Sequence, residues 1–169
     1  MNMNISNYKT KLNKITTFIF DVDGVLTNGK ILITSDGQMY RSMNTKDGFA
    51  IKLAISKGYR IAIISGGNNK GIIKRLSELN ISEIYLGVTD KLNTYKNLIR
   101  KNNITGKEIL YMGDDIPDIP VMKNVILSAC PKDAVSDVKN LVDYVSDKYG
   151  GEGCVREIIE QVLKVQNNW

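Results

Sequence analysis

The order of apolar and polar residues along the chain predicts short buried strands that alternate with amphipathic helices. Apolar runs rich in β-branched and aromatic residues predict strands at residues 16–20, 59–64, 84–86, 108–112, 125–127 and 141–145. Apolar residues spaced three or four apart predict helices at residues 47–57, 69–79, 90–101, 118–123, 133–140 and about 152–165. This alternation predicts an α/β fold with a Rossmann-like, doubly wound and mostly parallel sheet.

A β-hairpin is expected after the first strand. Residues 30–33 and 38–41 have the pattern of two short strands, and Ser35-Asp36-Gly37 between them contains the Asp-Gly pair that is common in hairpin turns. The hairpin would span about residues 29–42. With 169 residues in total, the chain suits one domain that covers residues 1–169.

Composition and charge exclude several classes of function. The 23 basic and 18 acidic residues give a net charge of +5, and they are scattered along the chain, so nucleic-acid binding is not expected. The chain has no histidine, which excludes Ser-His-Asp triads and histidine metal sites. Cys130 and Cys154 are far apart and fit free thiols in a reducing compartment. No apolar run approaches the roughly 20 residues of a membrane helix, so we expect a cytoplasmic protein without a membrane partner.

Polar residues cluster directly after three of the predicted strands. Asp21 and Asp23 follow the first strand, and residues two apart in an extended segment face the same side. Ser65 and Gly66 follow the strand at residues 59–64, and Asp114 follows the strand at 108–112. Ligands bind at the carboxyl ends of strands in such sheets, so these residues predict one shared site.

The side chains of this site favour Mg²⁺ and a phosphate group. Asp21, Asp23 and Asp114 offer hard oxygen ligands, and three carboxylates within about 4 Å would repel one another by several kcal/mol per pair without a cation. The Ser65 hydroxyl, a backbone amide near Gly66 and the ammonium group of Lys91 are suited to hold phosphate oxygens. An aspartate can attack a phosphoryl group, and a second carboxylic acid can protonate the leaving alcohol.

Four segments together resemble the motifs of the haloacid dehalogenase-like phosphatases. They are Asp21-Val22-Asp23-Gly24-Val25-Leu26-Thr27, Ser65, Lys91 and Gly113-Asp114-Asp115-Ile116-Pro117-Asp118, in the same order along the chain. The resemblance implies that Asp21 is the nucleophile and Asp23 the general acid and base. It also implies that Ser65, Gly66 and Lys91 bind phosphate. Mg²⁺ would be held by Asp21, the backbone carbonyl of Asp23 and Asp114, with Asp115 and Asp118 in support.

The rest of the chain is similar to the capless branch that includes the 3-deoxy-D-manno-octulosonate 8-phosphate phosphatases. The hairpin, Asn44-Thr45-Lys46-Asp47-Gly48 and Gly150-Gly151-Glu152-Gly153-Cys154-Val155-Arg156-Glu157 carry this similarity. The gaps between Asp21, Ser65 and Lys91 leave no room for a cap domain. The similarity implies a phosphorylated 2-keto-3-deoxy sugar acid as substrate and a homotetramer whose hairpins form a barrel. Substrate contacts are expected from Thr45, Lys46, Asp47, Gly48, Lys52 and Arg75.

Two positions depart from the octulosonate pattern and leave the identity of the sugar acid open. Gly67 stands where the octulosonate phosphatases usually have an arginine. Glu152 stands at the arginine position of their usual Gly-Gly-Arg-Gly sequence. A related nonulosonate 9-phosphate phosphatase has Gly-Gly-Glu-Gly, although it has a glutamate at the position of Gly67, so a sialic-acid-type 9-phosphate is the alternative substrate.

Two functions of a different class, a receiver domain and a non-catalytic module, fit the sequence less well than an enzyme does. A receiver domain also joins an acidic Mg²⁺ cluster, a hydroxyl and a lysine, but it places its phospho-accepting aspartate after the middle strand and its lysine after the last one. Here the acidic segment at residues 113–118 follows Lys91, so the order of the motifs differs from that of a receiver domain. A non-catalytic oligomerisation module would not need the complete set of catalytic side chains that this chain carries.

Overall fold

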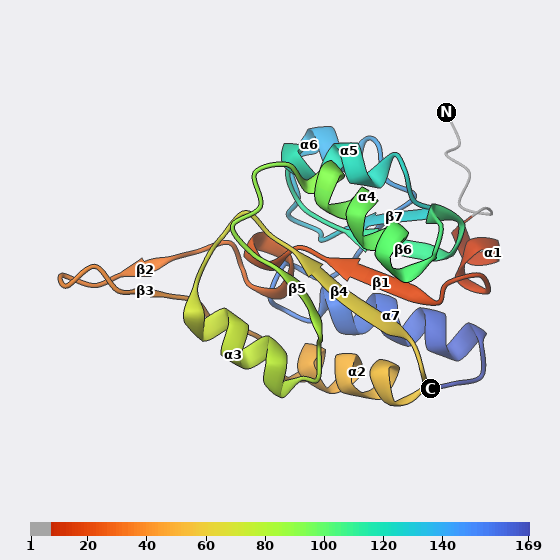
Figure 1. Cartoon of the computed structure of the whole chain (residues 1–169), viewed down its shortest axis with the longest axis horizontal. Coiled ribbons are helices and arrows are strands. Elements are labelled where there is room, and N and C mark those ends of the chain that lie inside the picture. The colour runs from red at the N-terminus through yellow and green to blue at the C-terminus, as the bar shows by residue number, and fades with distance from the viewer. Residues whose placement is uncertain (1–7) are drawn as a thin grey trace.

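The computed structural model describes residues 8–169, and its centre is one parallel β-sheet (Figure 1). The order of the strands across the sheet is β5-β4-β1-β6-β7-β8, and all neighbouring strands are parallel. The strands are β1 (Thr17–Phe20), β4 (Arg60–Ile64), β5 (Glu83–Tyr85), β6 (Ile109–Met112), β7 (Leu127–Cys130) and β8 (Tyr144–Val145). The doubly wound sheet predicted from the sequence is confirmed.

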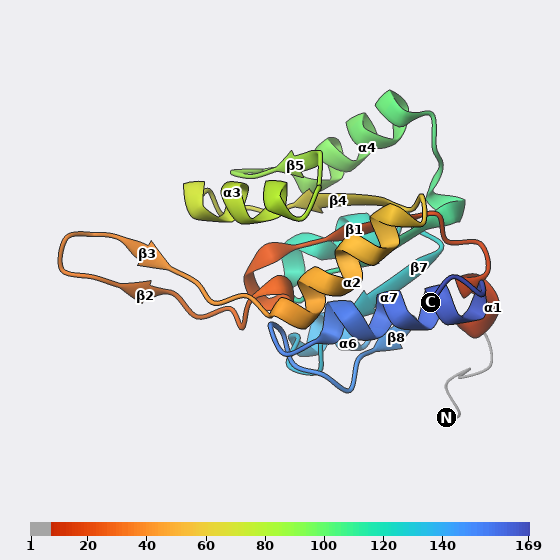
Figure 2. The same ribbon diagram turned by 90° about the horizontal axis from the view of Figure 1, so that it is seen from below.

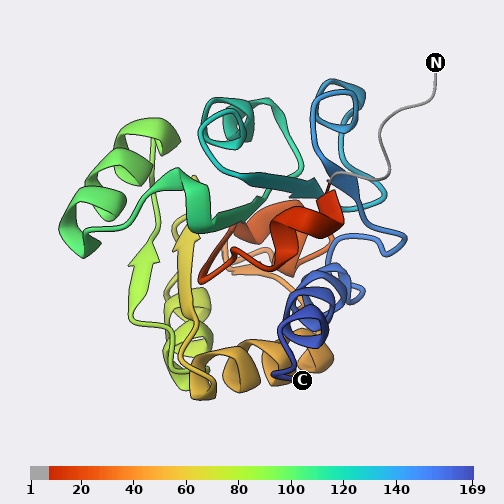
Figure 3. The same ribbon diagram turned by 90° about the vertical axis from the view of Figure 1, so that its right-hand side faces the viewer.

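Helices cover both faces of the sheet (Figures 1 and 3). Helices α2, α3 and α7 lie on one face, and α4, α5 and α6 lie on the other. The helices are α1 (Tyr8–Leu12), α2 (Thr45–Ser56), α3 (Lys70–Glu78), α4 (Lys91–Asn102), α5 (Ile119–Met122), α6 (Ser136–Lys139) and α7 (Cys154–Val165), with short turns η1 (Val22–Leu26), η2 (Gly106–Glu108) and η3 (Ile116–Asp118).

Most residues of the central strands are apolar because successive side chains enter two different cores. Phe18 and Phe20 of β1 pack in the core under α2 and α7, whereas Ile19 packs in the core under α4 and α5. Since both faces are covered, no strand residue of β1 faces solvent. This explains why the sequence shows continuous apolar runs at the strands and a 3.6-residue period at the helices.

The direction of winding reverses between β1 and β6. From β1 the chain proceeds through β4 to β5 on one side, and from β6 it proceeds through β7 to β8 on the other. The carboxyl ends of these two neighbouring strands meet, since Phe20 pairs with Met112. The crevice outside such a reversal is the usual ligand-binding position in this class of sheet.

The predicted hairpin is present and projects away from the sheet (Figures 1 and 2). It consists of β2 (Leu32–Ile33) and β3 (Met39–Tyr40), joined by a turn in which Gly37 has a φ of +81°. Only this hairpin, η1 and α2 lie between β1 and β4, and only α3 and β5 lie between β4 and α4. The described chain therefore has no cap domain in either connection.

Several element boundaries differ from the sequence-based prediction. β7 begins at Leu127 rather than Val125, because the backbone N–H of Ile126 donates to the carbonyl of Gly106 before pairing with β6 begins. The helix α1 was not predicted. At the end of the chain, the Trp169 ring packs against the Arg156 guanidinium and lies edge-to-face with the Phe49 ring.

Within the described residues, both cysteines are buried and free, as expected. The helices there lack the length and the apolar character needed to cross a bilayer.

Candidate active site

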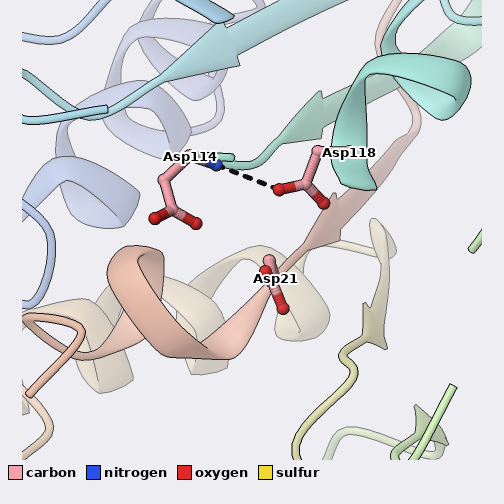
Figure 4. A group of neighbouring side chains, drawn as sticks. All are labelled: Asp21, Asp114 and Asp118. Carbon is pink, nitrogen blue, oxygen red and sulfur yellow. Dashed lines mark hydrogen bonds between the residues drawn. The ribbon is translucent and has the colours of Figure 1, made fainter. Parts of the chain in front are cut away.

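Three aspartates meet where the chain reverses its winding. Asp21 directly follows β1, Asp114 lies two residues beyond β6, and Asp118 ends η3. One carboxylate oxygen from each lies within 4.8 Å of the others, and Figure 4 shows the three side chains around one space. Gly24 keeps this space open, because a Cβ atom there would lie 2.0 Å from an oxygen of Asp114. Gly24 also has a φ of +86°, which favours glycine.

Asp21 is buried and held at both of its oxygens. Its Oδ1 accepts a hydrogen bond from the backbone N–H of Val22 at 2.6 Å, and its Oδ2 accepts one from the Lys91 ammonium at 2.7 Å. Burial raises the pKa of Asp21, and the charge of Asp118 raises it further, while Lys91 opposes both effects. The side chain is therefore fixed in one orientation that faces the shared space.

Asp118 is fully buried, and its hydrogen bonds occupy both oxygens. Its Oδ1 accepts from Lys91 at 2.7 Å and from the Tyr111 hydroxyl, and its Oδ2 accepts from the backbone N–H groups of Asp114 at 3.1 Å and Asp115 at 3.3 Å. These contacts orient Lys91 and the loop that carries Asp114. The supporting role of Asp118 in metal binding stays a prediction. Asp115 is exposed and caps the following turn through the N–H of Ile116.

Asp114 is half-buried, and the pKa of its carboxyl group is raised to about 7. Burial is the main cause, and the charges of Asp21 and Asp118 add to it. Removing carboxylates from water and placing them together is unfavourable unless a cation compensates their charge. This all-oxygen donor set, formed by groups that repel one another, fits a hard divalent cation such as Mg²⁺.

Asp23 forms an ion pair that the sequence did not predict. The Arg41 side chain comes from the base of the hairpin, and its Nε and Nη2 atoms donate to the two oxygens of Asp23 at 2.6 and 3.1 Å. Nothing in the sequence distinguished Arg41 from other basic residues, because the two partners are 18 residues apart and meet only through the fold.

One pocket of about 610 Å³ collects the predicted site residues. Ser65 and Gly66, which follow β4, line it opposite the loop after β6. Ser65 is buried, and Val88 donates its backbone N–H to the Ser65 carbonyl at 3.0 Å. The pocket lining includes every residue expected to be catalytic or to bind phosphate or metal: Asp21, Asp23, Ser65, Gly66, Lys91, Asp114, Asp115 and Asp118.

Comparisons with known proteins agree with this geometry. A model of the haloacid dehalogenase-like hydrolases matches residues 77–158. The 3-deoxy-D-manno-octulosonate 8-phosphate phosphatase of Salmonella typhi is 36% identical over 93% of this chain and 84% of its own length. The chain belongs to this family of haloacid dehalogenase-like phosphatases.

Solved structures of the family have the same fold. The phosphatase from Yersinia pestis superposes with a TM-score of 0.94 at 32% identity, and the match covers 96% of this chain and 88% of that one. The Moraxella catarrhalis phosphatase, solved with magnesium, phosphate and a KDO molecule, gives a TM-score of 0.93 at 33% identity over 99% of this chain and 95% of that one.

The residues of this chain that were expected to contact a sugar acid do not line the pocket that contains Asp21. Within the described chain, Arg75 lines a separate hollow of about 250 Å³ beside the hairpin, and Lys46 lines another of about 490 Å³ beside α7. Thr45 and Lys52 are exposed, and Gly48 packs against the Arg75 guanidinium. One chain does not bring these side chains together, and their substrate contacts stay a prediction.

Asp47 is buried, and its carboxylate accepts a hydrogen bond from the backbone at the start of α7. Its Oδ1 accepts a hydrogen bond from the N–H of Arg156 at 2.7 Å, and its Oδ2 has no hydrogen-bond partner within the described residues. Gly153 at the start of α7 has no side chain that could cap the helix, so Asp47 supplies the cap from another helix. The adjoining Gly151 donates its N–H to Val25 in the loop that follows Asp21.

We expect the substitution Asp47→Asn to change how stability depends on pH. Burial raises the pKa of Asp47 from 3.8 to about 6, although the backbone N–H groups of Arg156 and Gly153 oppose the rise. A carboxyl group with a raised pKa stabilises the folded state at low pH, and this contribution is lost as the pH rises from about 4 through 6. At 1.36 kcal/mol per pKa unit, the free energy of unfolding of the wild type should fall by about 3 kcal/mol relative to that of the variant over this pH range.

Urea unfolding of both proteins at pH 4 and pH 7.5 measures this difference. The exposed Asp137 offers a matched control, because Asp137→Asn makes the same chemical change in solvent. If the difference in free energy of unfolding between wild type and Asp47→Asn were the same at both pH values, the interpretation would be contradicted.

Proposed function

We propose that this chain is a Mg²⁺-dependent phosphomonoesterase that converts 3-deoxy-D-manno-octulosonate 8-phosphate to the free sugar acid and phosphate. The observation that carries the proposal is the meeting of Asp21, Asp114 and Lys91 in one pocket at the reversal of the sheet. The similar octulosonate 8-phosphate phosphatase of Moraxella catarrhalis, which was solved with magnesium, phosphate and KDO, supports the choice of substrate.

In the first step of the proposed reaction, an oxygen of Asp21 attacks phosphorus. The bond from phosphorus to the sugar oxygen breaks, and Asp23 gives its proton to that leaving oxygen, so the free sugar acid departs and an aspartyl-phosphate remains. Lys91 and Ser65 hold the oxygens of the phosphoryl group, whose charge spreads as the bonds change.

In the second step, Asp23 takes a proton from water, and the resulting hydroxide attacks the phosphorus of the aspartyl-phosphate. Inorganic phosphate leaves and the Asp21 carboxylate is restored. Mg²⁺ bound by Asp21, Asp114 and the backbone carbonyl of Asp23 would neutralise the carboxylates and the phosphate oxygens as they approach.

The proposed active form is a homotetramer in which neighbouring chains cover an otherwise open site. The hairpin supports this proposal, because its apolar side chains have no cover within one chain: Leu32 is 67% exposed and Ile33 is 64% exposed. Exposed apolar patches of this kind are typical of interfaces between protein chains.

A nonulosonate 9-phosphate is the second candidate substrate. Glu152 favours it, whereas Gly67 departs from the pattern of both kinds of phosphatase. A screen of phosphate release should therefore compare octulosonate 8-phosphate with nonulosonate 9-phosphates, with Mg²⁺ and with EDTA. We expect release only with Mg²⁺ and a higher kcat/KM for the octulosonate. A higher kcat/KM for a 9-phosphate would assign the alternative substrate, and equal release in EDTA would contradict the mechanism.

A further inference from the structure

Arg41 occupies an unusual place for an arginine on a projecting hairpin. It directly follows β3, yet its side chain is only 7% exposed. The guanidinium turns toward the sheet and donates to both oxygens of Asp23. Burying a guanidinium is unfavourable unless an anion pairs with it, so this contact determines where the side chain lies.

The backbone near Arg41 is anchored to the body of the protein. The Asn69 side chain donates to the carbonyl of Met39 at 3.1 Å. The same side chain accepts from the N–H groups of Gly71 and Ile72, and so caps α3. Arg41 therefore reaches Asp23 from a fixed point at the hairpin base, although the hairpin tip lies far from the sheet (Figure 2).

Asp23 needs such support more than Asp21 does. Its side chain is 32% exposed and lines the large pocket, whereas the side chain of Asp21 is 9% exposed and is held by Val22 and Lys91. A carboxylate can accept about four hydrogen bonds, and Arg41 uses two of these positions. Positions on both oxygens remain for a leaving oxygen or a water molecule.

We propose that Arg41 is a positioning residue that holds Asp23 in the orientation needed for proton transfer and thereby connects the hairpin to the reaction. This inference rests on the proposed function of Asp23. A proton donor must lie within hydrogen-bond reach of its target, and a misplacement of about 1 Å can reduce the rate about 100-fold. Loss of Arg41 should therefore impair the step in which the leaving oxygen needs a proton.

The test compares two substrates that differ in this need. The alkoxide leaving from octulosonate 8-phosphate requires a proton, whereas the phenolate leaving from p-nitrophenyl phosphate does not. We expect Arg41→Ala to lower kcat/KM for the sugar phosphate by roughly 10- to 100-fold and for the aryl phosphate by less than about 3-fold. Arg41→Lys keeps the charge and the long side chain but lacks the paired donors. Its kcat/KM for the sugar phosphate should therefore lie between those of the wild type and Arg41→Ala.

Two controls separate positioning from a structural or binding role. Arg100→Ala removes an exposed arginine of α4 and should change neither value of kcat/KM. In a chain that carries Asp23→Asn, adding Arg41→Ala should cause no further loss on the sugar phosphate, because both changes act through the same proton transfer.

The outcomes are distinguishable. Equal losses on both substrates, or an additional full loss in the Asp23→Asn background, would overturn the positioning role while leaving the proposed reaction intact. Wild-type protein that releases phosphate from neither substrate would instead refute the proposed reaction, and the role of Arg41 with it.

Discussion

Asp21→Asn should reduce kcat by at least about 10⁴-fold, because an amide oxygen does not displace an alcohol from phosphorus. We expect the variant to fold. An asparagine keeps an oxygen that can accept from the N–H of Val22, and Lys91 keeps its ion pair with Asp118. The side chain also has nearly the same volume, so the packing around β1 should be preserved.

Phosphate release from octulosonate 8-phosphate with Mg²⁺ measures this effect, and circular dichroism with thermal melting tests the fold. Asp137→Asn, an exposed change of the same chemistry on α6, should retain wild-type kcat. If folded Asp21→Asn kept wild-type turnover, Asp21 would not be the nucleophile and the two-step mechanism would be wrong.

The order of the strand ends was enough to predict which residues gather at the site. Asp21, Ser65 and Asp114 each follow a strand of the parallel sheet, and the carboxyl ends of such strands lie on one edge whatever the details of packing. Their convergence therefore depends on alternation of strands and helices, which apolar periodicity reveals. Asp118 was predicted from the same motif, and its buried contacts with Lys91 and Tyr111 show why that position needs a carboxylate.

Contacts between distant segments were not predictable in the same way. Asp47 caps a helix that begins 107 residues later in the chain, at Cys154, and Arg41 pairs with Asp23 only because the hairpin returns to the sheet. Neither contact has a local periodicity, so residue type alone cannot reveal it. The boundaries of β7 were misplaced for a related reason, since its apolar run begins before the residues that pair with β6.

The Gly150-Gly151 pair illustrates the same limit. A Cβ atom at Gly150 would lie 2.0 Å from the carbonyl oxygen of Gly24, and one at Gly151 would lie 2.7 Å from the backbone nitrogen of Asn28. The sequence indicated that this segment matters, but the reason is visible only in the fold: the start of α7 packs directly against the loop that follows Asp21.

Asp114→Asn should abolish Mg²⁺-dependent turnover and yet make the metal-free protein more stable. At pH 8 in EDTA, Asp114 is ionised beside Asp21 and Asp118, although burial and these charges raise its pKa to about 7. A raised carboxyl pKa means that stability is lost as the pH rises from about 4 through 7. Asparagine removes this penalty, which has an upper limit of about 4 kcal/mol at 1.36 kcal/mol per pKa unit.

Thermal unfolding at pH 8 and pH 5, each with EDTA or with Mg²⁺, separates the two effects. In EDTA the variant should melt at a higher temperature than the wild type, and the advantage should shrink at pH 5, where Asp114 binds a proton in the folded state. Added Mg²⁺ should raise the melting temperature of the wild type far more than that of the variant, because a ligand stabilises only the state that binds it. A variant that is less stable than wild type in EDTA would show that the three carboxylates do not repel one another, and the physical reason for placing a divalent cation among them would be lost.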